Sequence, residues 1–218
     1  LNTRLVLKYT AWLLLTGMCV VYILEHAHTM KSYRLEEQYL SAFFQSVTLR
    51  TAGFNSIPFG ALRDATYLVM IFFMFIGAAS GSTAGGIKVN TFSVINSSIT
   101  SYLKNWRNVV IENHTVPFEL VSKAYLILLF GIGIVFLGTL SLTITEQKPF
   151  LHLLVEAVSA FGTVGLSLGL TAKLSTFGKI VVIFTMLIER VGPLAIALAV
   201  GGEKPVRFKY AEERVMVG

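Results

Sequence analysis

Long apolar stretches alternate with short polar ones along the chain, and four of the apolar stretches are long enough to cross a bilayer. A hydrocarbon core of about 30 Å is crossed by about 20 helical residues. We expect spans at roughly 5–24, at 65–103 with an interruption, at 120–144 and at 177–200. Because a helix satisfies its own backbone within lipid, this pattern predicts an all-α membrane protein.

Two shorter apolar segments lie between these spans, at roughly 36–49 and 149–161. At about 1.5 Å per residue, each would reach only about 20 Å as a helix. Either one alone could be a helix at the membrane surface. The order of span, short helix, glycine-containing turn and span occurs twice, however, so the chain is predicted to be an internal repeat.

The residues at the two turns repeat as well. In each copy the end of a short helix is followed by a similar tetrapeptide, and the two copies are offset by 111 and 112 positions. Chance similarity between apolar stretches is the alternative, and the repeated architecture argues against it. The matched blocks are Ser46-Val47-Thr48 with Ala157-Val158-Ser159, and Thr51-Ala52-Gly53-Phe54 with Thr163-Val164-Gly165-Leu166.

Non-helical backbone at membrane depth is tolerated only where it is buried in protein or lines a watery cavity. The two turns carry little charge, so their remaining polar groups are mostly carbonyl oxygens, which can replace the hydration shell of a cation. Gly53 and Gly165 can adopt the restricted backbone geometry that such carbonyls need. The hypothesis requires that Ala52 and Val164 lie close together, with peptide groups outside ordinary helical bonding.

The second span is interrupted by a run of small and polar residues, Ser80-Gly81-Ser82-Thr83-Ala84-Gly85-Gly86. Glycine weakens a helix by about 1 kcal/mol, and Ser and Thr compete for backbone hydrogen bonds. We therefore expect the helix to break here and to form a flexible intramembrane loop that obstructs or opens a pore. A helix-packing face of small residues, or an ordinary loop between two shorter spans, is the alternative.

Composition agrees with the membrane class, since 54% of residues are hydrophobic, 14% are charged and the mean hydropathy is +0.69. The net charge of +6 needs no nucleic-acid partner, because Lys and Arg near lipid headgroups account for it. The single cysteine, Cys19, lies in an apolar run and is predicted to be buried. No metalloprotease, P-loop, Rossmann or nucleophile-elbow motif occurs, and we expect no enzyme activity.

Four stretches resemble the Trk/Ktr/HKT superfamily of potassium transporters, especially its Ktr-type ion-conducting membrane subunit. The resemblance covers essentially the whole chain and implies two span–pore-helix–span repeats with re-entrant filter loops and one broken helix. Family members resemble four fused membrane–pore–membrane units around one pathway, of which this chain matches the third and fourth. The stretches are "FFQSVTLRTAGFN" at 43–55, "MFIGAASGSTAGGIKV" at 74–89, "EAVSAFGTVGLSLGLT" at 156–171 and "IERVGPL" at 188–194.

The resemblance implies roles for individual residues. The third filter loop matches Thr51, Ala52 and Gly53, and the fourth matches Thr163, Val164 and Gly165. The family's gating loop matches Gly81, Ser82, Thr83, Gly85 and Gly86, with Ala84 where a glycine is frequent.

Two charged residues belong to the implied gate. Arg190 matches an arginine that faces the pathway, and a guanidinium in a membrane needs a partner or water. A salt bridge to Glu189, or an Arg190 side chain that reaches the membrane face, is the alternative. Lys88 follows the gating loop, and we expect it near the cytoplasmic mouth of the pathway.

The resemblance also implies an organisation of the chain. Residues 1–104 form one unit with the gating loop at 80–86, residues 105–118 a cytoplasmic connection, 119–202 the second unit and 203–218 a cytoplasmic tail. With both ends in the cytoplasm, nine basic residues lie inside and seven, including Arg50, lie outside. This bias is small, so the resemblance rather than the charge pattern places the ends.

The implied function is potassium (K+) uptake in a bacterial plasma membrane by a multi-pass protein, with sodium (Na+) as a further ion for symport or activation. Implied partners are membrane lipid, a second copy in a homodimer and a soluble RCK-type nucleotide-binding regulatory subunit. Four filter loops are needed around an ion and the chain has two. The opening on Leu1, without a start residue, favours a fragment. The amino-terminal half is then expected from the same chain or from a second one.

Two other functions compete with ion conduction. A secondary transporter of a small solute uses broken helices in the same way, but predicts several side-chain donors at midmembrane, and few are present beyond Ser, Thr and Arg190. A non-conducting half subunit that only assembles or regulates is the other.

Overall fold

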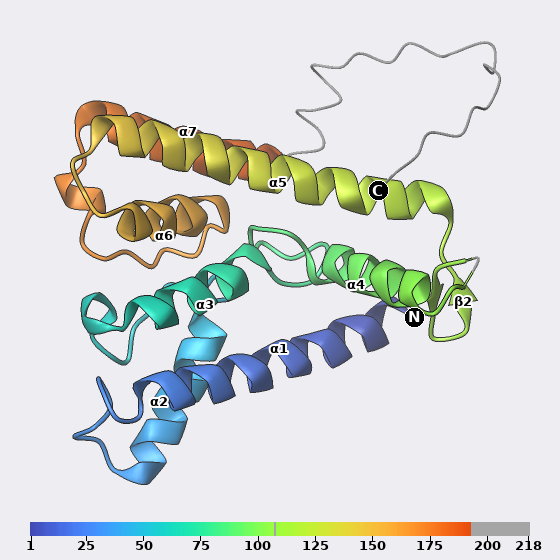
Figure 1. The fold of residues 1–218 in the computed structure, drawn as a ribbon, viewed down its shortest axis with the longest axis horizontal. Coiled ribbons are helices and arrows are strands. Elements are labelled where there is room, and N and C mark those ends of the chain that lie inside the picture. The colour runs from blue at the N-terminus through green and yellow to red at the C-terminus, as the bar shows by residue number, and fades with distance from the viewer. Residues whose placement is uncertain (107, 193–218) are drawn as a thin grey trace.

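The computed structural model describes residues 1–106 and 108–192, and its helices fall into two series of the same order. The first series is α1 (Asn2–Glu25), α2 (Leu35–Thr48), the short 3-10 helix η1 (Phe59–Ala61), α3 (Asp64–Phe75) and α4 (Val89–Leu103). The second is α5 (Phe118–Thr145), α6 (Phe150–Phe161), the 3-10 helix η2 (Thr171–Lys173) and α7 (Thr176–Val191). The prediction of an all-α fold with two repeats is thus confirmed (Figure 1).

A small hairpin joins the two series and was not expected. Strand β1 (Val110–Ile111) pairs antiparallel with β2 (His114–Thr115). The two residues between the strands, Glu112 and Asn113, have φ angles of 43° and 65°. Positive φ at both central residues is the geometry of the commonest two-residue hairpin turn, which explains why the chain reverses here.

Two helices of the described residues, α1 and α5, are long and apolar enough to cross a membrane by length and composition. The span at 65–103 is interrupted, as predicted: it consists of two shorter helices, α3 and α4, which follow one another along the molecule with a loop between them (Figure 1). The described part of α7 ends at Val191, so the last residues of the span predicted at 177–200, and the tail at 203–218, lie outside the described residues.

A buried carboxylate at the end of the first helix stabilises the start of the third helix in each unit. Glu25 accepts hydrogen bonds from the backbone N–H of Arg63 (3.0 Å) and from Thr66 Oγ1, at the beginning of α3. Glu146 accepts from the backbone N–H of Ser175 (3.0 Å) and from its hydroxyl (2.5 Å), at the beginning of α7. A negative charge there also suits the helix dipole. Both units therefore have a carboxylate that binds the start of the third helix, and this shared contact supports the internal repeat independently of the turns.

The two units pack against each other around an aromatic pair. Phe161 of α6 is 1% exposed, and its ring stacks on Phe75 of α3 with centroids 5.3 Å apart. A Cβ on Gly131 of α5 would lie 3.1 Å from the tip of Phe161, so this glycine lets α5 approach. The two units therefore pack against each other at the carboxyl end of α6, where Phe161 contacts both α3 and α5.

Cys19 is exposed, contrary to the prediction that it is buried. It lies on α1, where Trp12 and Leu15 are also exposed. An apolar residue on a membrane span can face lipid as readily as protein, so an apolar neighbourhood in the sequence did not determine its burial.

Candidate functional site

The two predicted turns share an unusual backbone conformation. Thr51 and Gly53 have φ angles of 74° and 78°, and Thr163 and Gly165 have φ angles of 49° and 89°. In each turn the residue between them is not in this left-handed region. Left-handed backbone is rare for a β-branched residue such as threonine, so two copies at equivalent positions indicate a constrained and specific conformation.

The amide groups of the turns are bonded to the ends of the preceding helices. The N–H of Ala52 donates to the carbonyl of Thr48 (3.1 Å), and the N–H of Val164 donates to the carbonyl of Ser159 (2.9 Å). The carbonyls behave differently. Within residues 1–106 and 108–192, no hydrogen bond is made to the carbonyl oxygens of Thr51, Ala52, Gly53, Thr163, Val164 or Gly165.

The two turns touch each other. A Cβ built on Gly53 would lie 2.5 Å from the carbonyl oxygen of Val164 and 3.4 Å from Cα of Gly165. A Cβ on Gly165 would lie 3.6 Å from Cα of Gly53. Segments far apart in the sequence thus bring two groups of unbonded carbonyls to one place, as the ion-binding hypothesis requires.

The helix break is wider than the predicted 80–86, because α3 ends at Phe75 and α4 begins at Val89. The ends of the loop are tied together by a parallel bridge between Ile76 and Ile87. Its hydrogen bonds run from Gly77 N–H to the Ile87 carbonyl (2.9 Å) and from Ile87 N–H to the Phe75 carbonyl (3.0 Å). The loop is therefore closed at its base by backbone hydrogen bonds.

The loop lies directly against the second turn. A Cβ on Gly85 would contact Thr163 Oγ1 and would lie 2.7 Å from the carbonyl oxygen of Gly162. Gly81 and Gly86 have φ angles of 86° and 74°, which favour glycine. Ala84 has no left-handed φ, so alanine fits at this position.

Both basic side chains of the predicted gate donate hydrogen bonds to backbone carbonyls of the loop. Arg190 Nη1 donates to the Thr83 carbonyl (2.9 Å), and Lys88 Nζ donates to the Ala84 carbonyl. No ion pair joins Arg190 to Glu189 in the part of the chain that the structure describes, so that alternative is not what forms. A cavity of about 360 Å³ is lined by Gly81, Ser82, Thr83, Ala84, Lys88, Glu189, Arg190 and Gly192.

Arg50 belongs to the site, although the charge pattern of the sequence places it only among the outer basic residues. It lies two residues after the end of α2, and its Nη2 donates to the carbonyl of Gly77 at the helix break (2.8 Å). The guanidinium thereby links the first turn to the base of the loop. The sequence feature that could have indicated this role is a single arginine directly before a predicted filter turn. Its partner, the Gly77 carbonyl, is distant in the sequence and could not be inferred.

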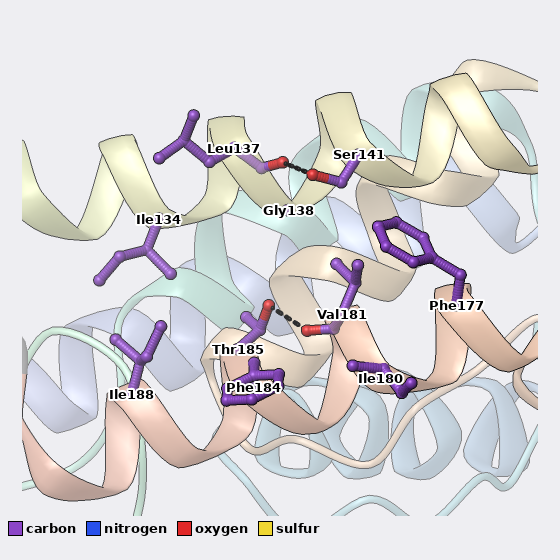
Figure 2. A pocket seen from close by; sticks show the side chains of 10 residues that line it. All are labelled: Ile134, Leu137, Gly138, Ser141, Phe177, Ile180, Val181, Phe184, Thr185 and Ile188. Carbon is purple, nitrogen blue, oxygen red and sulfur yellow. Dashed lines mark hydrogen bonds between the residues drawn. The ribbon is translucent and has the colours of Figure 1, made fainter.

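A second hollow of about 370 Å³ lies between α5 and α7, and none of its lining residues belongs to the turns or the loop. Figure 2 shows apolar side chains of both helices facing it. Its two hydroxyls bond back to their own helices, Ser141 to the Leu137 carbonyl (2.8 Å) and Thr185 to the Val181 carbonyl (2.9 Å). Apart from these two hydroxyls, the side chains that line this groove are apolar.

Among the described residues no group of three or more His, Cys, Asp or Glu side chains could hold a metal ion. The candidate ion ligands are the backbone carbonyls of the two turns, which accept no hydrogen bond within the described residues. Carbonyl oxygens with weak individual affinity suit an ion that must be released again.

Comparison with known proteins gives consistent matches. The chain is 41% identical to the Ktr system potassium uptake protein B of Bacillus subtilis (strain 168) and 40% identical to that of Vibrio alginolyticus, in both cases over all of this chain. It covers 49% and 48% of these relatives, so the chain spans about half of their length. It is 32% identical to the potassium/sodium uptake protein NtpJ of Enterococcus hirae, covering 50% of that protein.

A solved structure and a family model agree with these relatives. The fold matches the potassium transporter TrkH from Vibrio parahaemolyticus with a TM-score of 0.73 at 20% identity, over 88% of this chain and 43% of that one. Residues 2–206 match the TrkH family model, described as a cation transport protein. The chain therefore belongs to the TrkH family of cation transport proteins.

Proposed function

We propose that this chain forms part of a potassium uptake pathway, in which the carbonyls of two re-entrant turns replace water around a dehydrated ion. The observation that carries the proposal is the contact between two turns whose carbonyl oxygens make no hydrogen bond within the described residues. The names of the Bacillus and Vibrio relatives support potassium as the ion. The ligands are Thr51, Ala52, Gly53, Thr163, Val164 and Gly165.

The proposed pathway needs more than this chain. Four carbonyl turns surround an ion in a filter of this kind, and two are present here. We propose that the others come from sequence outside this chain or from a second chain. The assembly is a homodimer in the bacterial plasma membrane, crosses it several times, and binds a soluble RCK-type nucleotide-binding subunit. The words "Ktr system" in the relatives' names support a transporter of several components.

The loop between α3 and α4 is proposed as the gate. It lies against the second turn at Gly85, so it can obstruct the path below the carbonyls. Arg190 and Lys88 hold it through the carbonyls of Thr83 and Ala84. A positive charge beside the path also raises the barrier for a cation until the loop rearranges. The proposed gating residues are Gly81, Ser82, Thr83, Gly85, Gly86, Lys88 and Arg190.

Sodium is the second candidate cation. The Enterococcus relative is named a potassium/sodium uptake protein, which favours sodium as a transported or activating ion. Sodium uptake that persists without potassium would support transport. Faster potassium uptake without sodium entry would support activation.

The test is uptake of labelled rubidium and sodium by proteoliposomes that contain the complete transporter. Gly53→Ser and Gly165→Ser place a side chain at left-handed φ, at a cost of about 1–2 kcal/mol, so the preference for rubidium should fall about tenfold. Gly133→Ser is the matched control, because nothing lies within 4 Å of a Cβ there.

Three results would contradict the proposal. A rubidium preference that is unchanged in both turn variants would remove the carbonyl filter. Saturable uptake of a small organic solute, with no rubidium flux in the wild type, would favour a secondary transporter instead. A complete assembly that moves neither would indicate a half subunit that does not conduct.

A further inference from the structure

Each pore helix carries a buried polar side chain one residue before the repeated block, and neither is part of a turn. Gln45 of α2 is 0% exposed and Glu156 of α6 is 3% exposed. They occupy equivalent positions, because the blocks that follow them begin at Ser46 and Ala157. Their surroundings differ, and this difference carries the inference.

Glu156 holds the segment that leads away from the second turn. Its Oε1 accepts hydrogen bonds from Ser167 Oγ (3.0 Å) and from Thr171 Oγ1. Ser167 Oγ also accepts from the N–H of Gly169 (3.0 Å), so the carboxylate fixes a segment that is itself locally bonded. The bonds join the middle of α6 to residues 167–171, immediately beyond Gly165 and Leu166.

In the first unit the segment after the turn is held by Thr48, which is not the position equivalent to Glu156. Thr48 Oγ1 donates to the Phe54 carbonyl (2.6 Å) and accepts from the Phe54 N–H (2.8 Å). Gln45 has no hydrogen-bond partner for either side-chain polar atom within the described residues. Ser159, the equivalent of Thr48, makes no side-chain hydrogen bond in the same part of the chain. Among residues 1–106 and 108–192, each unit thus has one side chain that joins its pore helix to the segment after its turn, Thr48 in the first unit and Glu156 in the second.

A buried carboxylate is unfavourable unless hydrogen bonds compensate for lost hydration. Glu156 has these bonds at Oε1, while its Oε2 is buried without a partner among the described residues. The hydroxyls of Ser167 and Thr171 therefore gain a strong, charge-assisted acceptor. Such bonds restrict the movement of the segment that follows the carbonyls of Val164 and Gly165.

We propose that Glu156 is a positioning residue of the second turn, which sets the direction of the Val164 and Gly165 carbonyls by holding Ser167 and Thr171. This inference rests on the proposed filter function. It assigns control of ion selectivity to a side chain that does not touch the ion. The fixed backbone places oxygens at the spacing of a dehydrated potassium ion, and a released backbone also accommodates sodium.

The test compares the ratio of rubidium to sodium uptake in proteoliposomes of the complete transporter. Glu156→Ala and the pair Ser167→Ala with Thr171→Val remove the two sides of the same bonds. Each should lower the ratio about tenfold, and their combination should lower it no further, because residues that act through one contact are not additive. Glu156→Gln retains an acceptor oxygen and should keep the ratio within about threefold of wild type.

Ser141→Ala with Thr143→Val is the matched control. It removes the same two kinds of hydroxyl from α5, where both bond only to carbonyls of their own helix in the part of the chain that the structure describes. The control should leave the ratio unchanged. The uptake ratio does not depend on how much protein enters the vesicles. If Glu156→Ala does not assemble, the Ser167→Ala and Thr171→Val pair alone tests the positioning role.

The outcomes separate this inference from the proposed function. If Gly165→Ser lowers the ratio and the Glu156 and hydroxyl variants match the control, the positioning role is wrong and the filter remains. Additive effects of the two sets of variants would also overturn it. If Gly165→Ser itself has no effect, the filter hypothesis fails and the inference fails with it.

Discussion

Thr51 and Thr163 adopt a backbone conformation that costs an L-residue roughly 1–2 kcal/mol. Such strain persists only where surrounding structure enforces it, and it concentrates at functional sites. Here the contacts that enforce it are the hydrogen bonds from the backbone N–H groups of each turn to its pore helix, and the contact between the two turns. The strain is therefore consistent with carbonyls held ready for an ion.

The two turn glycines should respond differently to alanine. A Cβ on Gly53 would meet the Val164 carbonyl oxygen at 2.5 Å, whereas a Cβ on Gly165 meets nothing closer than 3.6 Å. Both have left-handed φ. Gly53→Ala should therefore add a backbone clash of about 1–3 kcal/mol to the strain that both variants share. Thermal unfolding of the solubilised transporter should show a lower midpoint for Gly53→Ala, and equal midpoints would contradict the contact.

Residue-level prediction succeeded where the signal was local. The glycine and threonine of each turn could be named because a similar tetrapeptide, with Thr and Gly at the same places, follows two short apolar helices. Arg50 and Glu156 could not be assigned, since their partners, Gly77 and Ser167 with Thr171, are defined by tertiary contacts. Aligning the two repeats places Glu156 opposite Gln45 and so singles it out as a charged residue in an apolar helix, but the alignment does not reveal which groups Glu156 binds.

At the scale of elements, the carboxylates of α1 and α5 should differ in sensitivity. Glu25 uses both oxygens, Oε1 for Arg63 N–H and Oε2 for Thr29 Oγ1 (2.8 Å). Among the described residues, Glu146 accepts hydrogen bonds through Oε1 alone, both from Ser175. Glu25→Gln turns one acceptor into a donor and should destabilise the protein by about 1–3 kcal/mol, more than Glu146→Gln.

Melting of the solubilised transporter measures this difference. Glu36→Gln is the control, because Glu36 is exposed in the first turn of α2. Equal melting temperatures for Glu25→Gln and the control would show that the carboxylate does not stabilise the start of α3.

The broken helix makes a second prediction at this scale. A Cβ on Gly85 would lie 2.7 Å from the Gly162 carbonyl oxygen, whereas nothing lies within 4 Å of a Cβ on Gly133 of α5, outside the loop. Overpacking costs about 1–3 kcal/mol, so Gly85→Ala should displace the loop from the turn and raise rubidium uptake severalfold. Gly133→Ala should stay close to the wild-type rate. A lower rate in a correctly assembled Gly85→Ala protein would contradict a gate that obstructs the path.

At the scale of the whole molecule, Phe161 joins the two units. Its ring is 1% exposed and lies between Phe75 of α3 and Gly131 of α5. Phe161→Ala should destabilise the protein by roughly 3–5 kcal/mol, because it leaves a cavity between the units. The control is Phe118→Ala on α5, where the side chain is 82% exposed. Thermal unfolding should separate the two, and similar midpoints would place the junction elsewhere.

The sequence by itself determined the class of protein, the order of its helices, the repeat and the two turns. These follow from hydropathy, element length and glycine placement, which act over a few residues. Only the tertiary structure decided which carbonyls remain without hydrogen bonds, that the turns meet, and that Arg50, Glu156 and Arg190 bind particular backbone or hydroxyl groups. Those contacts depend on how helices distant in the sequence pack. One unit holds the segment after its turn from Thr48 and the other from Glu156, at positions that are not equivalent, and the pattern of apolar residues does not reveal this difference.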